Sequence, residues 1–312
     1  MRILLVVATY VGYIFIVTMY TIKIVKYLKL PLHLRSEIYP VRSDQHEREE
    51  KSYLENLEWW TKPQEEDFIG KTLYLIKEYF LLSDYFRWDK GYWLFLYPWH
   101  IGFILIITFH ILSFLGAFAE LLSFPVVANS PSMIGSAIYY LSLGIGVTSF
   151  VAGLLGSIGI MIKRLADEKL RDYATPLNYF TYFFLLAVFL TGLYSWYFAD
   201  PSFHEYRAFW KGLITFKPIN VQMAASVHIL LFALLLIYLP FTRSLHYITR
   251  FFSFFLIRWD DKPNLRGSKL EKEIEGFLER KVTWRAPHVR HGKSWRQNAV
   301  ETSHQDQKGI RL

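Results

Sequence analysis

The chain has 312 residues, of which 53% are hydrophobic and 18% aromatic, and its formal net charge is +8. It contains no cysteine, which excludes disulfides, cysteine-ligated iron–sulfur clusters, thiolate zinc sites and covalently attached c-type haem. The apolar residues form long blocks and the basic residues lie between them, a distribution that indicates membrane topology rather than nucleic-acid binding.

Five segments are apolar enough, over the ~20 residues that a bilayer requires, to form spanning helices. These helices are expected at residues 3–22, 98–120, 133–162, 177–199 and 221–246. The first segment is interpreted as a helix and not as a signal peptide, because it lacks a small-residue cleavage site and is followed by lysines. The sequence therefore predicts an all-α integral membrane protein with five transmembrane helices.

One of the segments between the expected spans is predicted to be helical, and the others are predicted to be loops. Residues 70–85 (GKTLYLIKEYFLLSDY) are amphipathic and lie among tryptophans, a composition typical of a helix in the membrane interface. Residues 121–132, 163–176 and 200–220 are expected to be loops. We expect a membrane domain at 1–260, including a cytoplasmic segment at 23–97, and a basic cytoplasmic tail at 261–312.

The positive charges indicate the orientation of the chain. With five spans, one side of the membrane would hold four of the 35 Lys and Arg residues, namely Arg2, Arg207, Lys211 and Lys217. The other side would hold the remaining 31. Because cytoplasmic loops carry the excess of Lys and Arg, the N-terminus is expected outside and the C-terminus in the cytoplasm.

Four histidines lie within the apolar segments. His228 and His246 are 18 residues apart on the fifth expected helix, which is five turns, so both rings would leave the same helix face. His100 and His110 lie on the second expected helix, which runs antiparallel to the fifth. His100 is therefore expected level with His246 on the cytoplasmic side, and His110 level with His228 on the outer side. Two pairs of imidazoles predict two bis-histidine haem irons, which favour electron transfer.

Other interpretations remain open for these histidines. They could relay protons in a transporter or channel, or pack between the helices of a haem-free membrane anchor. Zinc is disfavoured because no Asp or Glu lies nearby to complete a tetrahedral site. His204 and Glu120 are weaker candidates for handling protons at the outer side. The remaining histidines are expected to be ordinary surface residues: His33, His46, His288, His291 and His304.

The spacing of the four histidines resembles that of the gamma subunit of respiratory nitrate reductase. The strings LPLHLRSEIYPV (30–41), LEWWTKP (57–63) and YPWHIG (97–102) are similar to one branch of this superfamily. That branch comprises the haem b membrane subunits of redox complexes in sulfate-reducing and related bacteria, which pair with heterodisulfide-reductase-like iron–sulfur proteins. The resemblance extends from residue 1 to about residue 260.

The resemblance implies two b haems, one held by His100 and His246 and the other by His110 and His228. It also implies exchange of menaquinone or menaquinol near the outer haem, and electron transfer to or from a cytoplasmic iron–sulfur partner. We expect the basic and aromatic cytoplasmic surface to dock this partner, at Arg35, Arg42, Trp59, Trp60 and the tail after Arg258. The expected location is the cytoplasmic (inner) membrane of a bacterium or archaeon. Further membrane or periplasmic cytochrome subunits are expected as partners, and binding of nucleic acid is not expected. The sequence departs from the nitrate reductase subunit after the second helix, where that subunit has a quinol-site lysine, because residues 121–162 contain no Lys or Arg.

Overall fold

The computed structural model describes residues 1–29, 68–243, 246, 248–251, 266–286 and 288–301. The chain forms two compact units, one of residues 1–21 and 72–245 and one of residues 22–71 and 246–312. The described residues are helical and form no strand beyond two isolated β-bridges.

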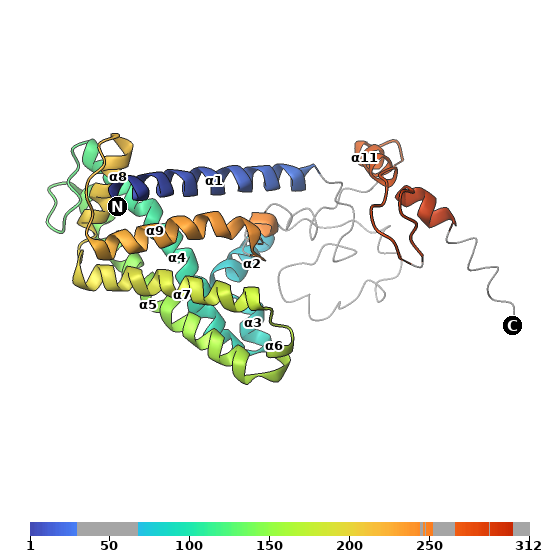
Figure 1. The fold of residues 1–312 in the computed structure, drawn as a ribbon, viewed down its shortest axis with the longest axis horizontal. Helices are drawn as coiled ribbons and strands as arrows, with labels where there is room; N and C mark the ends of the chain where they lie inside the picture. The colour runs from blue at the N-terminus through green and yellow to red at the C-terminus, as the bar shows by residue number, and fades with distance from the viewer. Residues whose placement is uncertain (30–67, 244–245, 247, 252–265, 287, 302–312) are drawn as a thin grey trace. The chain divides into compact units, whose positions relative to one another are not determined.

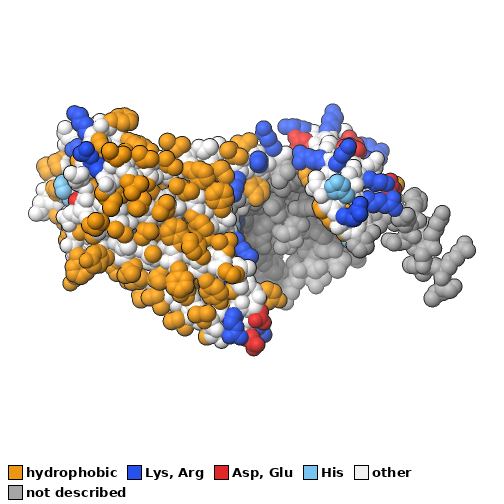
Figure 2. Space-filling model, viewed as in Figure 1, with side chains coloured by type: hydrophobic (Ala, Val, Ile, Leu, Met, Phe, Trp, Pro, Cys, Tyr) orange, Lys and Arg blue, Asp and Glu red, His pale blue; other side chains and the backbone are white. Residues whose placement is uncertain are grey.

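Five of the described helices are long and apolar enough to cross a membrane, which confirms the predicted all-α architecture with five candidate spans. They are α1 (Arg2–Leu28), α4 (Lys90–Leu121), α5 (Met133–Ala166), α7 (Pro176–Phe198) and α9 (Met223–Tyr238), the last continued by the 3-10 turn η3 (Leu239–Phe241). Figure 2 shows apolar side chains covering the visible face of these helices, with Lys and Arg gathered near their ends. An apolar surface of this extent requires a lipid environment.

In the first unit, α4 packs along α5, α5 along α7, and α7 along α9. The short helix α8 (His204–Ile214) packs against α4 and lies across one end of the bundle, close to the N-terminus of the chain (Figure 1). We call this end of the bundle the α8 end. The amphipathic segment predicted at 70–85 forms two helices, α2 (Phe68–Leu81) and α3 (Ser83–Trp88), because Leu82 between them is left-handed with φ of 49°. Its location in the membrane interface stays a prediction.

Helix α4 starts eight residues before the predicted position near Pro98. The Asp89 side chain accepts a hydrogen bond from the Tyr92 backbone N–H at 2.8 Å and caps the helix at this earlier point. The helix then continues through Pro98, which membrane helices tolerate when a neighbouring helix packs against the interrupted turn. Here Gly156 of α5 lies directly against the backbone of Pro98 and Trp99.

The fifth helix is shorter than predicted. Helix α9 and η3 end at Phe241, directly after Pro240, and Thr242 is extended with φ of −102° and ψ of 176°. The expectation of one continuous helix through His246 is therefore wrong. The five-turn argument that aligned His246 with His228 does not apply.

Two predicted loops contain helices. Residues 163–176 include the last turn of α5 and the short helix α6 (Glu168–Asp172), and residues 200–220 include α8. The start of α8 is fixed by buried Asp200, whose carboxylate accepts hydrogen bonds from the backbone N–H groups of His204 at 2.7 Å and Tyr206 at 3.0 Å. A carboxylate at this position also interacts favourably with the positive end of the helix dipole.

Close packing between α4 and α5 depends on glycine. A Cβ at Gly156 would lie 2.1 Å from the Trp99 backbone nitrogen, whereas a Cβ at Gly144 on the same helix would meet nothing within 4 Å. We expect Gly156→Ala to destabilise the bundle by about 1–3 kcal/mol through overpacking. Gly144→Ala should be neutral or stabilising by up to about 1 kcal/mol because alanine favours the helix. Thermal unfolding of the detergent-solubilised variants tests this, and equal melting temperatures would contradict the packing described.

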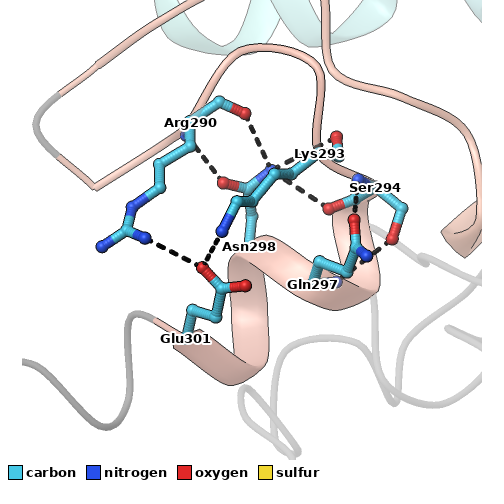
Figure 3. Close-up of polar contacts among 6 residues, drawn as sticks. All are labelled: Arg290, Lys293, Ser294, Gln297, Asn298 and Glu301. Carbon is cyan, nitrogen blue, oxygen red and sulfur yellow. Dashed lines mark hydrogen bonds and ion pairs between the residues drawn. The ribbon is translucent and has the colours of Figure 1, made fainter.

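The second unit includes a small folded piece within the predicted tail at 261–312. Helix α11 (Lys269–Leu278) is followed by a hydrogen-bonded segment in which Val282 and Val289 are buried. In Figure 3, Asn298 accepts a hydrogen bond from the Arg290 backbone at 2.6 Å and donates to the Ser294 carbonyl at 3.0 Å. Lys293 and Arg290 both pair with Glu301, and the hydrogen bond from Lys293 holds the pKa of Glu301 below its usual range.

Candidate functional site

Three of the four predicted haem-ligating histidines lie in the first unit. His100, His110 and His228 are buried there at 6%, 3% and 3% exposure. His246 belongs to the second unit and is exposed. The structure thus brings together His110 and His228, and the predicted pairing of His100 with His246 stays a prediction.

His110 on α4 and His228 on α9 meet across the bundle, with ring centroids 5.9 Å apart and ring planes inclined at 43°. Helix α4 packs chiefly along α5, and helix α9 packs chiefly along α7. The contact between α4 and α9 is therefore made by side chains such as these two histidines. The sequence predicted that these two residues would meet, because they were expected at the same level on antiparallel helices.

The hydrogen bonds of both rings fix the same tautomer. His110 Nδ1 lies 2.8 Å from the Ile106 carbonyl oxygen, and His228 Nδ1 lies 3.1 Å from the Val188 carbonyl oxygen. A carbonyl only accepts, so each Nδ1 carries the proton and donates. In a neutral imidazole the Nε2 atom then has a free lone pair, and both Nε2 atoms are buried without a hydrogen-bond partner.

Aromatic side chains surround the pair. Tyr206 of α8 lies edge-on to His110 with centroids 5.4 Å apart, and Phe150 of α5 lies edge-on to His228 at 5.4 Å. Phe232, one turn along α9 from His228, stacks on His110 with a centroid separation of 3.4 Å. Two buried imidazoles with free Nε2 atoms fit the axial ligands of a haem, provided that Phe232 turns away from His110 to admit the ring.

The donor set also matches what a haem requires of the protein. Ligating imidazoles commonly donate the second ring nitrogen to a carbonyl, which orients the ring and raises the basicity of the ligating nitrogen. Within the part of the chain that the structure describes, no three His, Asp or Glu side chains gather to hold a bare metal ion. A porphyrin supplies its own nitrogens and needs only two axial ligands, so the residues present fit a haem iron.

His100 lies in a different environment. Its Nε2 is 2.8 Å from the carbonyl oxygen of Tyr79 on α2. Because that carbonyl accepts, Nε2 is the protonated nitrogen here and its lone pair is not free. A ligand role for His100 would require α2 to release this contact or the ring to turn over.

A buried ion pair at the α8 end is a feature that the sequence did not reveal. Arg207 of α8, 1% exposed, has its Nε 3.5 Å from Oε1 of Glu120 at the end of α4. It also donates to the carbonyl oxygens of Ser202 at 2.9 Å and Val126 at 3.0 Å. Burial lowers the pKa of Arg207, and the nearby Glu120 carboxylate offsets part of that effect. Glu120, a candidate proton acceptor from the sequence, is therefore the partner of a fixed cation.

The other candidates lie on the surface or outside the described residues. His204 is exposed at the start of α8, and only its backbone N–H takes part in the cap made by Asp200. His288 and His291 are exposed in the second unit. The structure does not describe His33, His46 and His304, nor the proposed docking positions Arg35, Arg42, Trp59 and Trp60.

Comparison with known proteins gives a match to one family. A sequence model of the nitrate reductase gamma subunit family matches residues 93–260, which include α4 from its fourth residue onward, α5 to α9 and all four candidate histidines. No curated protein and no solved structure matches the chain. The match covers more than half of the 312 residues, and the chain belongs to the nitrate reductase gamma subunit family, a family of membrane cytochrome b electron-transfer subunits.

Proposed function

We propose that this protein is the di-haem cytochrome b subunit of a respiratory complex in the cytoplasmic membrane of a bacterium or archaeon. It passes electrons between the menaquinone pool, at a site on the outer side, and a cytoplasmic iron–sulfur partner of the heterodisulfide-reductase-like type. The observation that carries the proposal is the meeting of His110 and His228 with both Nε2 atoms buried and unpartnered. A haem bound there would accept and release one electron at a time.

The surrounding residues keep this site suited to electron transfer. The carbonyls of Ile106 and Val188 hold the two rings in the tautomer that presents Nε2. Phe150 and Tyr206 exclude water from both rings. A haem iron held by both imidazoles would have no open coordination position for oxygen or a substrate, and the group would supply electron transfer in preference to chemistry at the iron.

The second haem is assigned to His100 and His246. His100 is 10 residues before His110 on α4, about 15 Å along the helix axis, and so lies toward the opposite end of the bundle from α8. Two haems at these two levels would connect the two sides of the membrane. The excess of Lys and Arg supports an N-terminus outside and a C-terminus inside, which makes the α8 end the outer end.

The folded piece of the second unit supports a docking role for the tail. Trp284 and Trp295 lie 6.1 Å apart between ring centroids and are 47% and 38% exposed. Exposed tryptophans next to basic residues are typical of the surfaces through which proteins bind one another. In the proposed orientation this piece lies in the cytoplasm, where the iron–sulfur partner binds.

The experiment is to purify the chain from membranes and to measure its reduced-minus-oxidised optical spectrum together with the haem-to-protein ratio. A sharp α-band and two haems per chain are expected. A transporter, a proton channel or a haem-free anchor would give no such band. Subunits that co-purify would identify the iron–sulfur partner.

A further inference from the structure

Two further buried polar atoms lie close to the histidine pair. The Tyr13 hydroxyl of α1 and the Trp210 indole N–H of α8 are both buried and make no hydrogen bond within the described residues. Trp210 is 8% exposed, and its ring meets that of Tyr13 edge-on with centroids 5.0 Å apart. Two side chains from different helices therefore have their rings in contact, and the buried donor of each lacks an acceptor among the described residues.

This pair of donors is continuous with the site at His110. Phe232 has its centroid 6.5 Å from that of Tyr13 and stacks on His110 at 3.4 Å. On α8, Tyr206 is one turn before Trp210 and lies edge-on to His110. Burial raises the pKa of Tyr206 and the Trp210 indole offsets part of the rise, although the contact between them does not meet hydrogen-bond geometry.

Helix α1 fixes the position of Tyr13 next to this site. The Tyr10 hydroxyl donates to the Leu213 carbonyl of α8 at 2.7 Å, and a Cβ at Gly12 would lie 2.8 Å from the Ala233 carbonyl oxygen of α9. These contacts hold one turn of α1 against α8 and α9. Ile14 and Val17 of the same helix are 64% and 63% exposed, so α1 places an apolar face toward the lipid beside this pair.

The chemistry of the pair indicates what it binds. A buried donor without a partner is destabilising, so each of these donors calls for an acceptor in the functional state. Aromatic rings surround both donors, so the acceptor belongs on a flat apolar molecule. A ring carbonyl of a lipid-soluble quinone has both properties.

We propose that Tyr13 and Trp210 donate hydrogen bonds to one ring oxygen of the quinone that exchanges electrons at the outer haem, a carbonyl oxygen in the quinone and a hydroxyl oxygen in the quinol. This inference rests on the proposed function and adds the residues that hold the quinone ring. It assigns the site to α1 and α8, whereas the loop after α4 lacks the lysine that the resemblance would place there.

The test uses haem-loaded full-length protein in membranes, with menadiol as the electron donor and the haem α-band as the readout. Tyr13→Phe and Trp210→Phe remove the donors and keep the rings. Each is expected to raise the KM for menadiol about tenfold, the effect of losing one hydrogen bond. Tyr194→Phe on α7 makes the same chemical change at a side chain that is 54% exposed and outside the proposed site, and as the matched control it should keep the wild-type KM.

The outcomes separate this inference from the proposed function. Wild-type KM values in both single variants and in the double variant, with haem content unchanged, would overturn the inference alone. A wild-type protein without haem, or with haem that menadiol cannot reduce, would overturn the proposed function. If a variant loses its haem, photolabelling of the wild-type protein with an azido-naphthoquinone decides: labels on α1 or α8 support the inference, and labels confined to other segments refute it.

Discussion

Replacing His110 or His228 with alanine is expected to remove one of the two proposed haems completely and to leave the other bound. In the proposed assignment each residue would supply one nitrogen ligand to the same iron, since the Nε2 atoms of both are buried and unpartnered and the two rings meet. The α-band should fall to about half because one of two irons is lost. His100→Ala and His246→Ala should remove the other haem, so that His110→Ala combined with His246→Ala leaves none.

Matched controls separate ligand loss from general damage. His204→Ala removes an exposed imidazole at the α8 end and should leave both haems in place. Phe232→Leu removes the ring stacked on His110 and should retain haem, because this ring has to move aside for the haem to bind. Two haems retained in both His110→Ala and His228→Ala would refute the assignment of this pair. Loss of both haems in each single variant, with the protein still folded, would refute the division into two independent pairs.

The spanning helices were predictable because their signal is local. A segment of ~20 residues without charge has few alternatives to a membrane helix, so all five spans followed from the sequence. Helix α8 was missed because His204, Arg207 and Lys211 gave its segment the composition of a loop. The spacing of Tyr206, Phe209, Trp210 and Leu213, at i, i+3, i+4 and i+7, was the available signal for an amphipathic helix, and all four are buried.

The site was predictable only in part. The meeting of His110 with His228 followed from level positions on antiparallel helices. The break after Pro240 ends the helix before His246, so a spacing argument that assumes one rigid helix does not reach that residue. The burial of Arg207 depends on Glu120 and Val126, which are 87 and 81 residues earlier in the chain. Contacts at such separations leave no periodic trace in a single sequence.

Arg207→Leu is expected to destabilise the α8 end by about 3–5 kcal/mol, the cost of removing one partner from a buried ion pair. The change would leave the Glu120 carboxylate, 14% exposed, without its closest cation. It would also leave the carbonyls of Val126 and Ser202 without the donors that now satisfy them. Because α8 carries Tyr206 against His110, the outer haem should be lost at a lower temperature than the inner one.

Lys211→Ala is the matched control. Its Nζ lies 3.9 Å from the same carboxylate, but the side chain is 42% exposed, and exposed pairs contribute only about 0–1 kcal/mol. The measurement is the temperature at which each haem is released from the detergent-solubilised protein, followed by the α-band. Equal release temperatures in the Arg207 and Lys211 variants would show that burial of the guanidinium does not stabilise this end. A lowered temperature for Arg207→Leu that Glu120→Gln in the same chain partly restores would show that the unpaired carboxylate is the cause.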